Sequence, residues 1–201
     1  MTERVNRPTA LVVRFILKRL LYLPTLWRWG FEVVGGERLP GRRRPLIVTS
    51  NHAARIDTLF LIQALRPRFT VCGAHPRYFR TGALRLLMAD AKILSVDDHE
   101  SFLADCRALL DSGEILLIYP EFGRRPDGLG SFSTWPAELA LQAGVPLLPC
   151  YLYGTTRGHE GRVRLFVGHE IEPRGEATEL TERLRRETSA LEPTASRPEA
   201  A

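Results

Sequence analysis

A histidine and an aspartate five residues apart, His52 and Asp57, are the residues of this sequence whose types and spacing best suit chemistry. A carboxylate bonded to one ring nitrogen fixes the histidine tautomer and leaves the other nitrogen free to accept a proton near neutral pH. On one helix the two residues would point about 140° apart, since each residue turns the helix by about 100°. We therefore expect the chain to turn between a candidate general base and its orienting carboxylate.

The sequence around this pair predicts a strand, a turn and a helix. Residues 45–49 form the β-branched run of a buried strand, and residues 58–65 have the apolar character of a helix. His52 then lies where a strand ends. The pair alone leaves an alternative open, because such a histidine is often structural and Asp57 would suit a helix N-cap.

A second polar segment follows another predicted strand, residues 114–119, which is strongly apolar and expected inside the sheet. This segment contains Glu121, Gly123, Arg124 and Arg125. In open α/β sheets, sites form at the carboxyl ends of strands, so we expect this segment to face His52. The alternative is a surface turn in which Glu121 pairs with Arg124.

The remaining elements alternate between strands and helices. Strands are predicted at residues 31–34, 69–74, 92–96, 145–153 and 163–167, and helices at 82–89, 99–111, 136–143 and around Leu180, Leu184 and Leu191. This alternation predicts an α/β layered fold with a mixed, largely parallel sheet of about seven strands flanked by helices. Residues 97–100 are acidic but match a helix-capping pattern, and no metal cofactor is expected.

The N-terminal segment, residues 9–29, is the most apolar part of the chain, yet it is interrupted by basic side chains: Arg14, Lys18, Arg19 and Arg28. Its longest uncharged run is shorter than the roughly 20 apolar residues that cross a bilayer. The pattern predicts a basic amphipathic helix in the membrane interface. A helix packed on the domain is the alternative. We expect a membrane-associating segment at 1–30, one domain at 31–191 and a disordered tail at 192–201.

Composition supports a single domain with a substantial core, since the chain has 201 residues and is 44% hydrophobic. The net charge of +5 comes almost wholly from arginine. Guanidinium groups suit phosphate, although a genomic composition bias explains the enrichment equally well. No nucleic-acid partner is expected, because the arginines are dispersed and no binding module is recognisable.

The basic run at residues 41–45 is interpreted as a solvated turn or a contact for lipid phosphates. Cys72, Cys106 and Cys150 lie in apolar runs and are expected to be reduced core residues of an intracellular protein.

The order of these parts resembles the glycerolipid acyltransferase family, of the 1-acyl-glycerol-3-phosphate acyltransferase type, over roughly residues 10–170. The first family motif, NHxxxxD, is matched in full by Asn51, His52 and Asp57. The third, usually FPEGTRS, is partly matched by residues 119–125, and the fourth, VPxxPV, is matched by residues 145–150.

The resemblance implies an O-acyltransferase in which His52 deprotonates the hydroxyl of a lysophospholipid or related lipid acceptor and Asp57 orients the imidazole. The hydroxyl attacks an acyl thioester of coenzyme A or acyl carrier protein, and no further cofactor is implied. The implied substrate-binding residues are Asn51, Arg55, Glu121, Gly123, Arg124 and Arg125. The implied location is peripheral, on the cytoplasmic face of the cell membrane.

Several residues depart from the family pattern. Phe122 and Trp135 stand where the family has glycine, Gly123 stands where it has threonine, and residues 97–98 are acidic where its second motif ends in arginine. We therefore expect a retained catalytic pair with altered acceptor recognition. The alternative is a lipid-binding or scaffold protein that has lost turnover on the same fold.

Overall fold

The computed structural model describes residues 29–40, 44–65, 70–72, 92–94, 99–121, 123–156 and 161–193. Several predicted features lie outside these residues: the segment 1–28, the helix at 82–89, residues 97–98, Phe122 and the tail from residue 194. Within the described ranges, no helix has both the length and the apolar character needed to span a bilayer.

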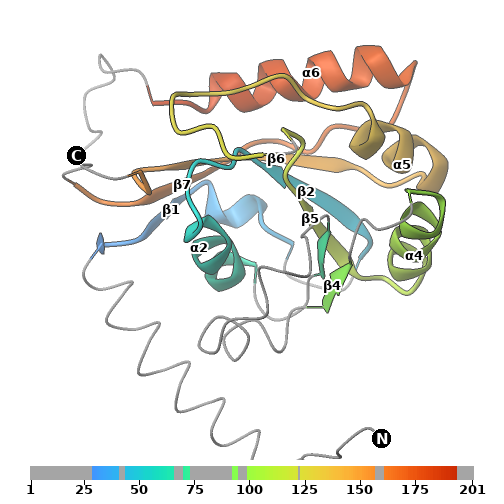
Figure 1. Cartoon of the computed structure of the whole chain (residues 1–201), viewed down its shortest axis with the longest axis horizontal. Coiled ribbons are helices and arrows are strands. Elements are labelled where there is room, and N and C mark those ends of the chain that lie inside the picture. The colour runs from blue at the N-terminus through green and yellow to red at the C-terminus, as the bar shows by residue number, and fades with distance from the viewer. Residues whose placement is uncertain are drawn as a thin grey trace, which may run out of the picture.

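The described strands form one sheet in the order β1-β7-β6-β2-β5-β3-β4 (Figure 1). Their bounds are β1 Glu32–Val34, β2 Leu46–Ser50, β3 Thr70–Cys72, β4 Lys92–Leu94, β5 Ile115–Ile118, β6 Leu147–Tyr153 and β7 Arg164–Val167. β2 is parallel to β5 and β6, and β3 is parallel to β4 and β5, whereas β7 is antiparallel to β6. The carboxyl ends of β2 and β5 therefore lie at the same edge of the sheet.

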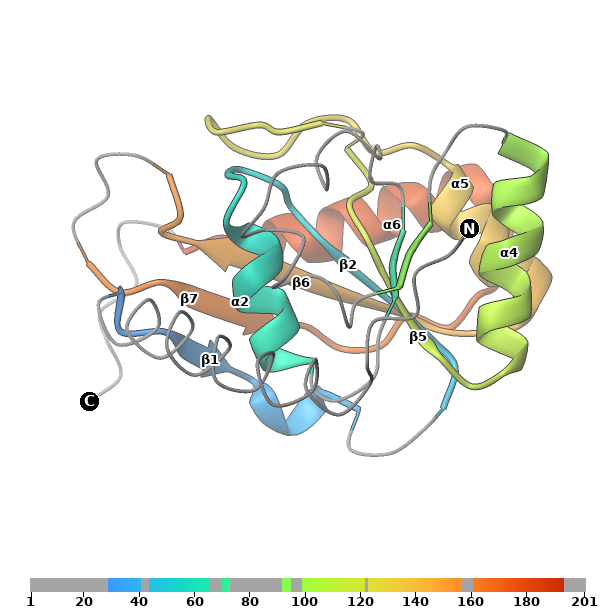
Figure 2. The same ribbon diagram turned by 60° about the horizontal axis from the view of Figure 1, so that its bottom comes forward.

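Helices cover both faces of this sheet (Figure 2). Helix α2, Asp57–Ala64, packs on one face, and α4, His99–Asp111, α5, Trp135–Ala143, and α6, Ala177–Ala190, pack on the other. The predicted layered α/β fold with a largely parallel sheet is confirmed. The short 3₁₀ helix η1, Gly36–Arg38, was not predicted, because the glycine pair before it indicated only the end of a strand.

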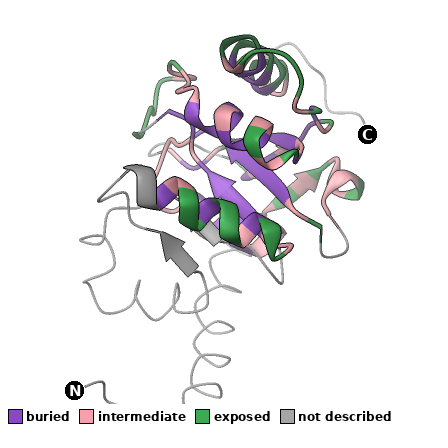
Figure 3. Cartoon of the chain, turned by 90° about the vertical axis from the view of Figure 1, so that its right-hand side faces the viewer, coloured by how far each residue is buried: buried purple, intermediate pink, exposed green. Residues whose placement is uncertain are grey.

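The core divides along the alternation of the strands. Leu46 and Val48 of β2 point into the cluster beneath α2, whereas Ile47 points into the cluster beneath α4, α5 and α6. β2 and β5 are buried along their whole lengths, as expected for parallel strands covered on both faces (Figure 3). Burial on each face contributes about 25 cal/mol for every Å² of apolar surface removed from water.

Two of the three cysteines are described with their side chains, and both are buried and free of disulfides. Cys106 of α4 packs in the cluster between α4, α5 and the sheet, and Cys150 packs on the opposite face. Burial raises the pKa of the Cys150 thiol to about 12, so this thiol stays protonated at neutral pH. The prediction of reduced core cysteines is confirmed for this pair.

The predicted basic run at residues 41–45 is described from Arg44 onward. The guanidinium of Arg44 pairs with both carboxylate oxygens of Glu170, with Nη1 2.9 Å from Oε2. Arg44 is one of the residues that were considered as contacts for lipid phosphates. In the structure its guanidinium is bonded to Glu170, and this ion pair joins the residues before β2 to the residues after β7.

Gly35 and Gly113 provide a matched test of packing at the edge of the sheet, because both have a φ of 79°. A Cβ atom on Gly35 would lie 2.7 Å from the carbonyl oxygen of Val167 in β7, whereas one on Gly113 would meet nothing within 4 Å. Gly113→Ala should cost about 1–2 kcal/mol for the left-handed backbone alone. Gly35→Ala should cost roughly 1–3 kcal/mol more, because β7 must also move. Urea unfolding of both variants measures the difference, and equal losses would contradict this account of the β1 to η1 turn.

Candidate active site

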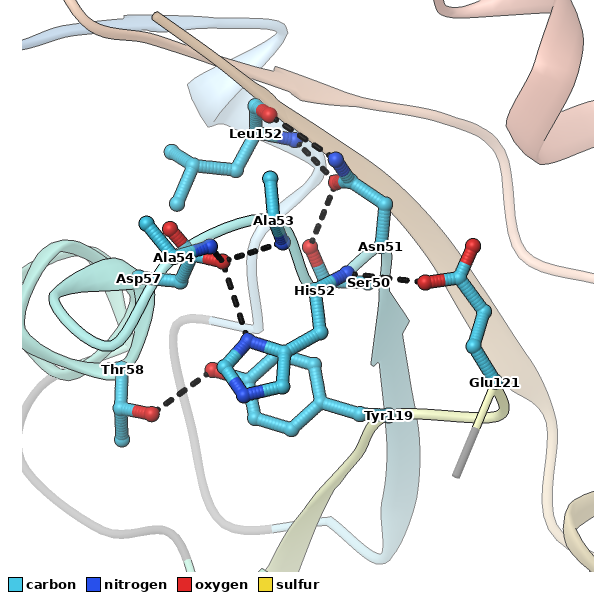
Figure 4. A network of polar contacts seen from close by, with 10 residues as sticks. All are labelled: Ser50, Asn51, His52, Ala53, Ala54, Asp57, Thr58, Tyr119, Glu121 and Leu152. Atoms are coloured by element: carbon cyan, nitrogen blue, oxygen red, sulfur yellow. Dashed lines mark hydrogen bonds and ion pairs between the residues drawn. The ribbon is translucent and has the colours of Figure 1, made fainter. Parts of the chain in front are cut away.

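His52 lies two residues beyond the end of β2 and faces the first residue of α2 (Figure 4). Its Nδ1 atom is 3.0 Å from Oδ2 of Asp57, and the side chain of His52 keeps 20% of its surface exposed. The predicted strand, turn and helix are confirmed. Asp57 belongs to the first turn of α2, and the N-cap position is held by Ile56, so the N-cap alternative is wrong.

The carboxylate of Asp57 also organises the turn between the strand and the helix. Its Oδ2 atom accepts the backbone N–H groups of Ala53 and Ala54 at 2.7 and 2.8 Å. The side chain is 1% exposed and lies at the N-terminus of α2, where the helix dipole favours negative charge. With a carboxylate as acceptor, Nδ1 of His52 carries the hydrogen, and Nε2 is left with its lone pair.

The backbone of His52 is held by the segment that follows β5. Its N–H donates to Oε2 of Glu121 at 3.1 Å, and its carbonyl accepts the N–H of Arg125 at 2.7 Å. The other oxygen of Glu121 accepts the N–H of Gly130 at 2.7 Å. The two strand ends therefore meet, as predicted, and Glu121 bonds three parts of the chain together rather than pairing with Arg124.

Glu121 is nearly enclosed, with 6% of its surface exposed. Burial raises the pKa of its carboxyl group, and the N–H donors of Gly130 and His52 oppose that rise, as does the charge of Arg125. A buried carboxylate that accepts two backbone donors is well suited to fix the peptide of the histidine.

Asn51 is directed toward β6. Its Oδ1 accepts the N–H of Leu152 at 2.7 Å, and its Nδ2 donates to the carbonyl of the same residue at 3.0 Å. The amide thus continues the β2 to β6 ladder one residue beyond the Ser50 and Cys150 pair. These bonds assign Asn51 to holding the strand ends in register, and its contact with a substrate stays a prediction.

Four predicted substrate-binding residues lie at the surface beside the pair: Arg55, Gly123, Arg124 and Arg125. The side chain of Arg125 lies against Gly130, where a Cβ atom would be 3.2 Å from its Cγ. Arg124 forms no hydrogen bond or ion pair with the described part of the chain. The substrate contacts of these residues and of Glu121 stay predictions.

Trp135 contributes to the core rather than to the site. Its side chain is 4% exposed and packs edge-on against Phe102 of α4, with ring centroids 5.2 Å apart. The departure from glycine at this position therefore fills the space between α4 and α5.

Two residues of the site were not predicted, Tyr119 and Thr58. The ring of Tyr119 stacks on the imidazole of His52, with centroids 4.1 Å apart and planes 19° apart, and its hydroxyl is 2.9 Å from Oγ1 of Thr58. Burial, with the charge of Asp57 second, raises the pKa of this phenol, so the hydroxyl keeps its proton. The only sign of them in the sequence is their position next to predicted site residues, since Thr58 directly follows Asp57 and Tyr119 stands two residues before Glu121.

Across the described residues, no three His, Cys, Asp or Glu side chains are grouped in a way that would hold a metal ion.

Comparison with known proteins places this geometry in context. A family model described as Acyltransferase matches residues 30–153. A 1-acyl-sn-glycerol-3-phosphate acyltransferase of Pseudomonas aeruginosa is 29% identical over 80% of this chain and 66% of its own length. A protein of the same name from Borreliella burgdorferi is 25% identical over 70% of this chain and 59% of its own length. The chain thus spans less than two thirds of the length of these relatives.

A solved structure shares the fold. It is the crystal structure of the 1-acyl-sn-glycerophosphate acyltransferase PlsC from Thermotoga maritima, with a TM-score of 0.67, 21% identity, and coverage of 96% of this chain and 86% of that one. The family model spans the stretch from before β1 to the end of β6, which includes the carboxyl ends of both β2 and β5. On these grounds, the chain belongs to the acyltransferase family.

Proposed function

We propose that this protein transfers an acyl group from a thioester to a hydroxyl of a glycerolipid acceptor, with His52 as the general base. The observation that carries the proposal is the contact of His52 Nδ1 with Asp57, which leaves Nε2 as a base on a partly exposed ring. Membership of the acyltransferase family and the names of the two relatives support the reaction type and the class of acceptor.

The proposed reaction needs no enzyme nucleophile. Nε2 of His52 takes the proton of the acceptor hydroxyl as its oxygen attacks the thioester carbonyl, and Asp57 stabilises the imidazolium that forms. The tetrahedral intermediate collapses with cleavage of the carbon–sulfur bond. The imidazolium returns its proton to the departing thiolate, which leaves an ester, a free thiol and a neutral histidine.

His52→Ala should lower kcat/KM by roughly 10²- to 10⁴-fold, because a positioned general base contributes a factor of that size. The measurement is thiol release from acyl-coenzyme A or acyl carrier protein with a panel of glycerolipid acceptors. His169→Ala is the matched control, since His169 is exposed and lies outside the site. Equal activity of His52→Ala and wild type would refute the mechanism. Vesicle binding without thiol release from wild type on any acceptor would favour a lipid-binding protein without turnover.

Glu121 acts in this proposal by fixing the peptide of His52. Glu121→Gln leaves one acceptor oxygen for two backbone donors, so one buried N–H loses its partner, and stability should fall by about 1–3 kcal/mol. The histidine should shift, and kcat should fall roughly tenfold to hundredfold with little change in the KM of the acceptor. Steady-state kinetics and urea unfolding test this, with the exposed Glu172→Gln as control. A higher acceptor KM at wild-type kcat would instead identify Glu121 as an acceptor ligand.

We also propose that the protein is peripheral, on the cytoplasmic face of the membrane, and bound through its N-terminal segment. The basic and apolar composition of residues 9–29 supports an amphipathic helix there. The domain side of this segment is firmly attached, because Trp29 and Phe31 pack on Phe60 of α2, with ring centroids 6.1 and 5.1 Å apart. Trp29 is therefore held against the helix that carries Asp57.

Reversing three N-terminal charges, Arg14→Glu with Lys18→Glu and Arg19→Glu, should weaken sedimentation with anionic vesicles strongly, since each basic residue near such a surface is worth about 1 kcal/mol. The matched control reverses three exposed arginines near and on α6: Arg174, Arg183 and Arg186. It changes the net charge equally, on the face of the sheet opposite α2, and should bind nearly as wild type does. Equal weakening by both triple variants would show that net charge alone governs binding.

A further inference from the structure

Four side chains at the site form a closed ring of contacts drawn from three elements (Figure 4). His52 bonds Asp57, and Thr58, the next residue of α2, bonds Tyr119. Tyr119 closes the ring by stacking on His52. Two consecutive residues of α2 thus hold the imidazole: Asp57 bonds its edge directly, and Thr58 bonds the tyrosine that stacks on its face.

We propose that Tyr119 and Thr58 are positioning residues that hold the imidazole of His52 in its working orientation, an inference that rests on the proposed function. A single bond at Nδ1 leaves the ring free to tilt about the axis to its acceptor. The stacked phenol prevents that tilt, because an imidazole held 19° from a ring whose centroid is 4.1 Å away cannot rotate without losing the contact. The hydroxyl bond to Thr58 holds the phenol in turn.

The surroundings of the imidazole give this stack a second effect. Asp57 of α2 bonds the imidazole itself, and Glu121, in the segment after β5, lies near enough for the charge of His52 to lower its pKa. During acyl transfer the imidazole becomes a cation, and the face of an aromatic ring attracts a cation. Tyr119 therefore supports the charged form from above the ring plane, while Asp57 supports it from the edge.

The hydroxyl of Tyr119 serves as a tether. Burial and the charge of Asp57 keep the phenol protonated, so its bond to Thr58 persists over the pH range in which histidine works. The same hydroxyl is absent from phenylalanine, the residue that the motif usually has at this position. In this chain the tether joins the residue that follows β5 to α2 directly.

Three variants separate the tether from the stack. Tyr119→Phe and Thr58→Val each remove the hydroxyl bond and leave the ring, and each should lower kcat about threefold to tenfold with little effect on KM. Because both substitutions remove the same hydrogen bond, the kcat of the double variant should be no lower than the kcat of either single variant. Tyr119→Leu removes the aromatic ring as well as the hydroxyl, and its kcat should be a further threefold to tenfold lower.

Tyr151→Phe is the control for the loss of a buried tyrosine hydroxyl. Tyr151 bonds Glu192 at 2.8 Å on the face of the sheet covered by α6, so its variant should lose thermal stability and keep its kcat. A merely structural role for Tyr119 would give the same outcome as this control: lower stability with an unchanged kcat.

An NMR measurement on the free protein tests the positioning without substrate. The ring protons of His52 should show the ring-current shift of a stacked phenol in wild type, keep it in Tyr119→Phe and Thr58→Val with broader lines, and lose it in Tyr119→Leu. Wild-type spectra and wild-type kcat in both single variants, or losses that add in the double variant, would overturn the inference. If wild type releases no thiol while the His52 shifts follow this pattern, the proposed function fails and the positioning role stands.

Discussion

The structure depends on one carboxylate oxygen, Oδ2 of Asp57, which accepts three hydrogen bonds where β2 turns into α2. Two come from the backbone of Ala53 and Ala54 and shape the turn, and the third comes from the imidazole of His52. The hydrogen bonds that shape the turn and the bond that fixes the tautomer of His52 therefore share a single acceptor atom. A change at Asp57 alters the path of the chain and the state of the histidine together, which is why the two residues act as one unit.

The parallel sheet supplies the second constraint, because it brings the ends of β2 and β5 to the same edge. Thr49 pairs with Ile118 in this register, so the residues beyond each strand run side by side. Glu121 and Arg125 then bond the N–H and the carbonyl of His52. A segment that the sequence motif associates with substrate thus supports the backbone of His52 in the folded protein. Its arginine side chains remain directed to the surface, and its carboxylate is directed inward.

The sequence sufficed for the described strands and α-helices and for the pairing of His52 with Asp57, because these follow from local patterns: buried β-branched runs, a helical run after Asp57, and fixed motif spacing. It did not suffice for contacts between distant segments. The amide of Asn51 bonds a residue 101 positions away, and Thr58 bonds one 61 positions away. Neither a hydroxyl nor an amide shows in the sequence which backbone or ring it will meet. The core position of Trp135 was likewise not visible in the sequence, since a departure from a motif does not reveal that the side chain fills the core.

The helix α2 connects His52 to the first described residues of the domain. Its first residue holds the imidazole, its second holds the stacked tyrosine, and its fourth, Phe60, packs against Trp29 and Phe31. A rigid helix of this length keeps these contacts at fixed separations. The position of Trp29, at the start of the described domain, is therefore set, through α2, relative to His52. In the proposed peripheral enzyme this fixed relation would matter, because the reacting hydroxyl would lie at a set height in the membrane interface and His52 would have to meet it there.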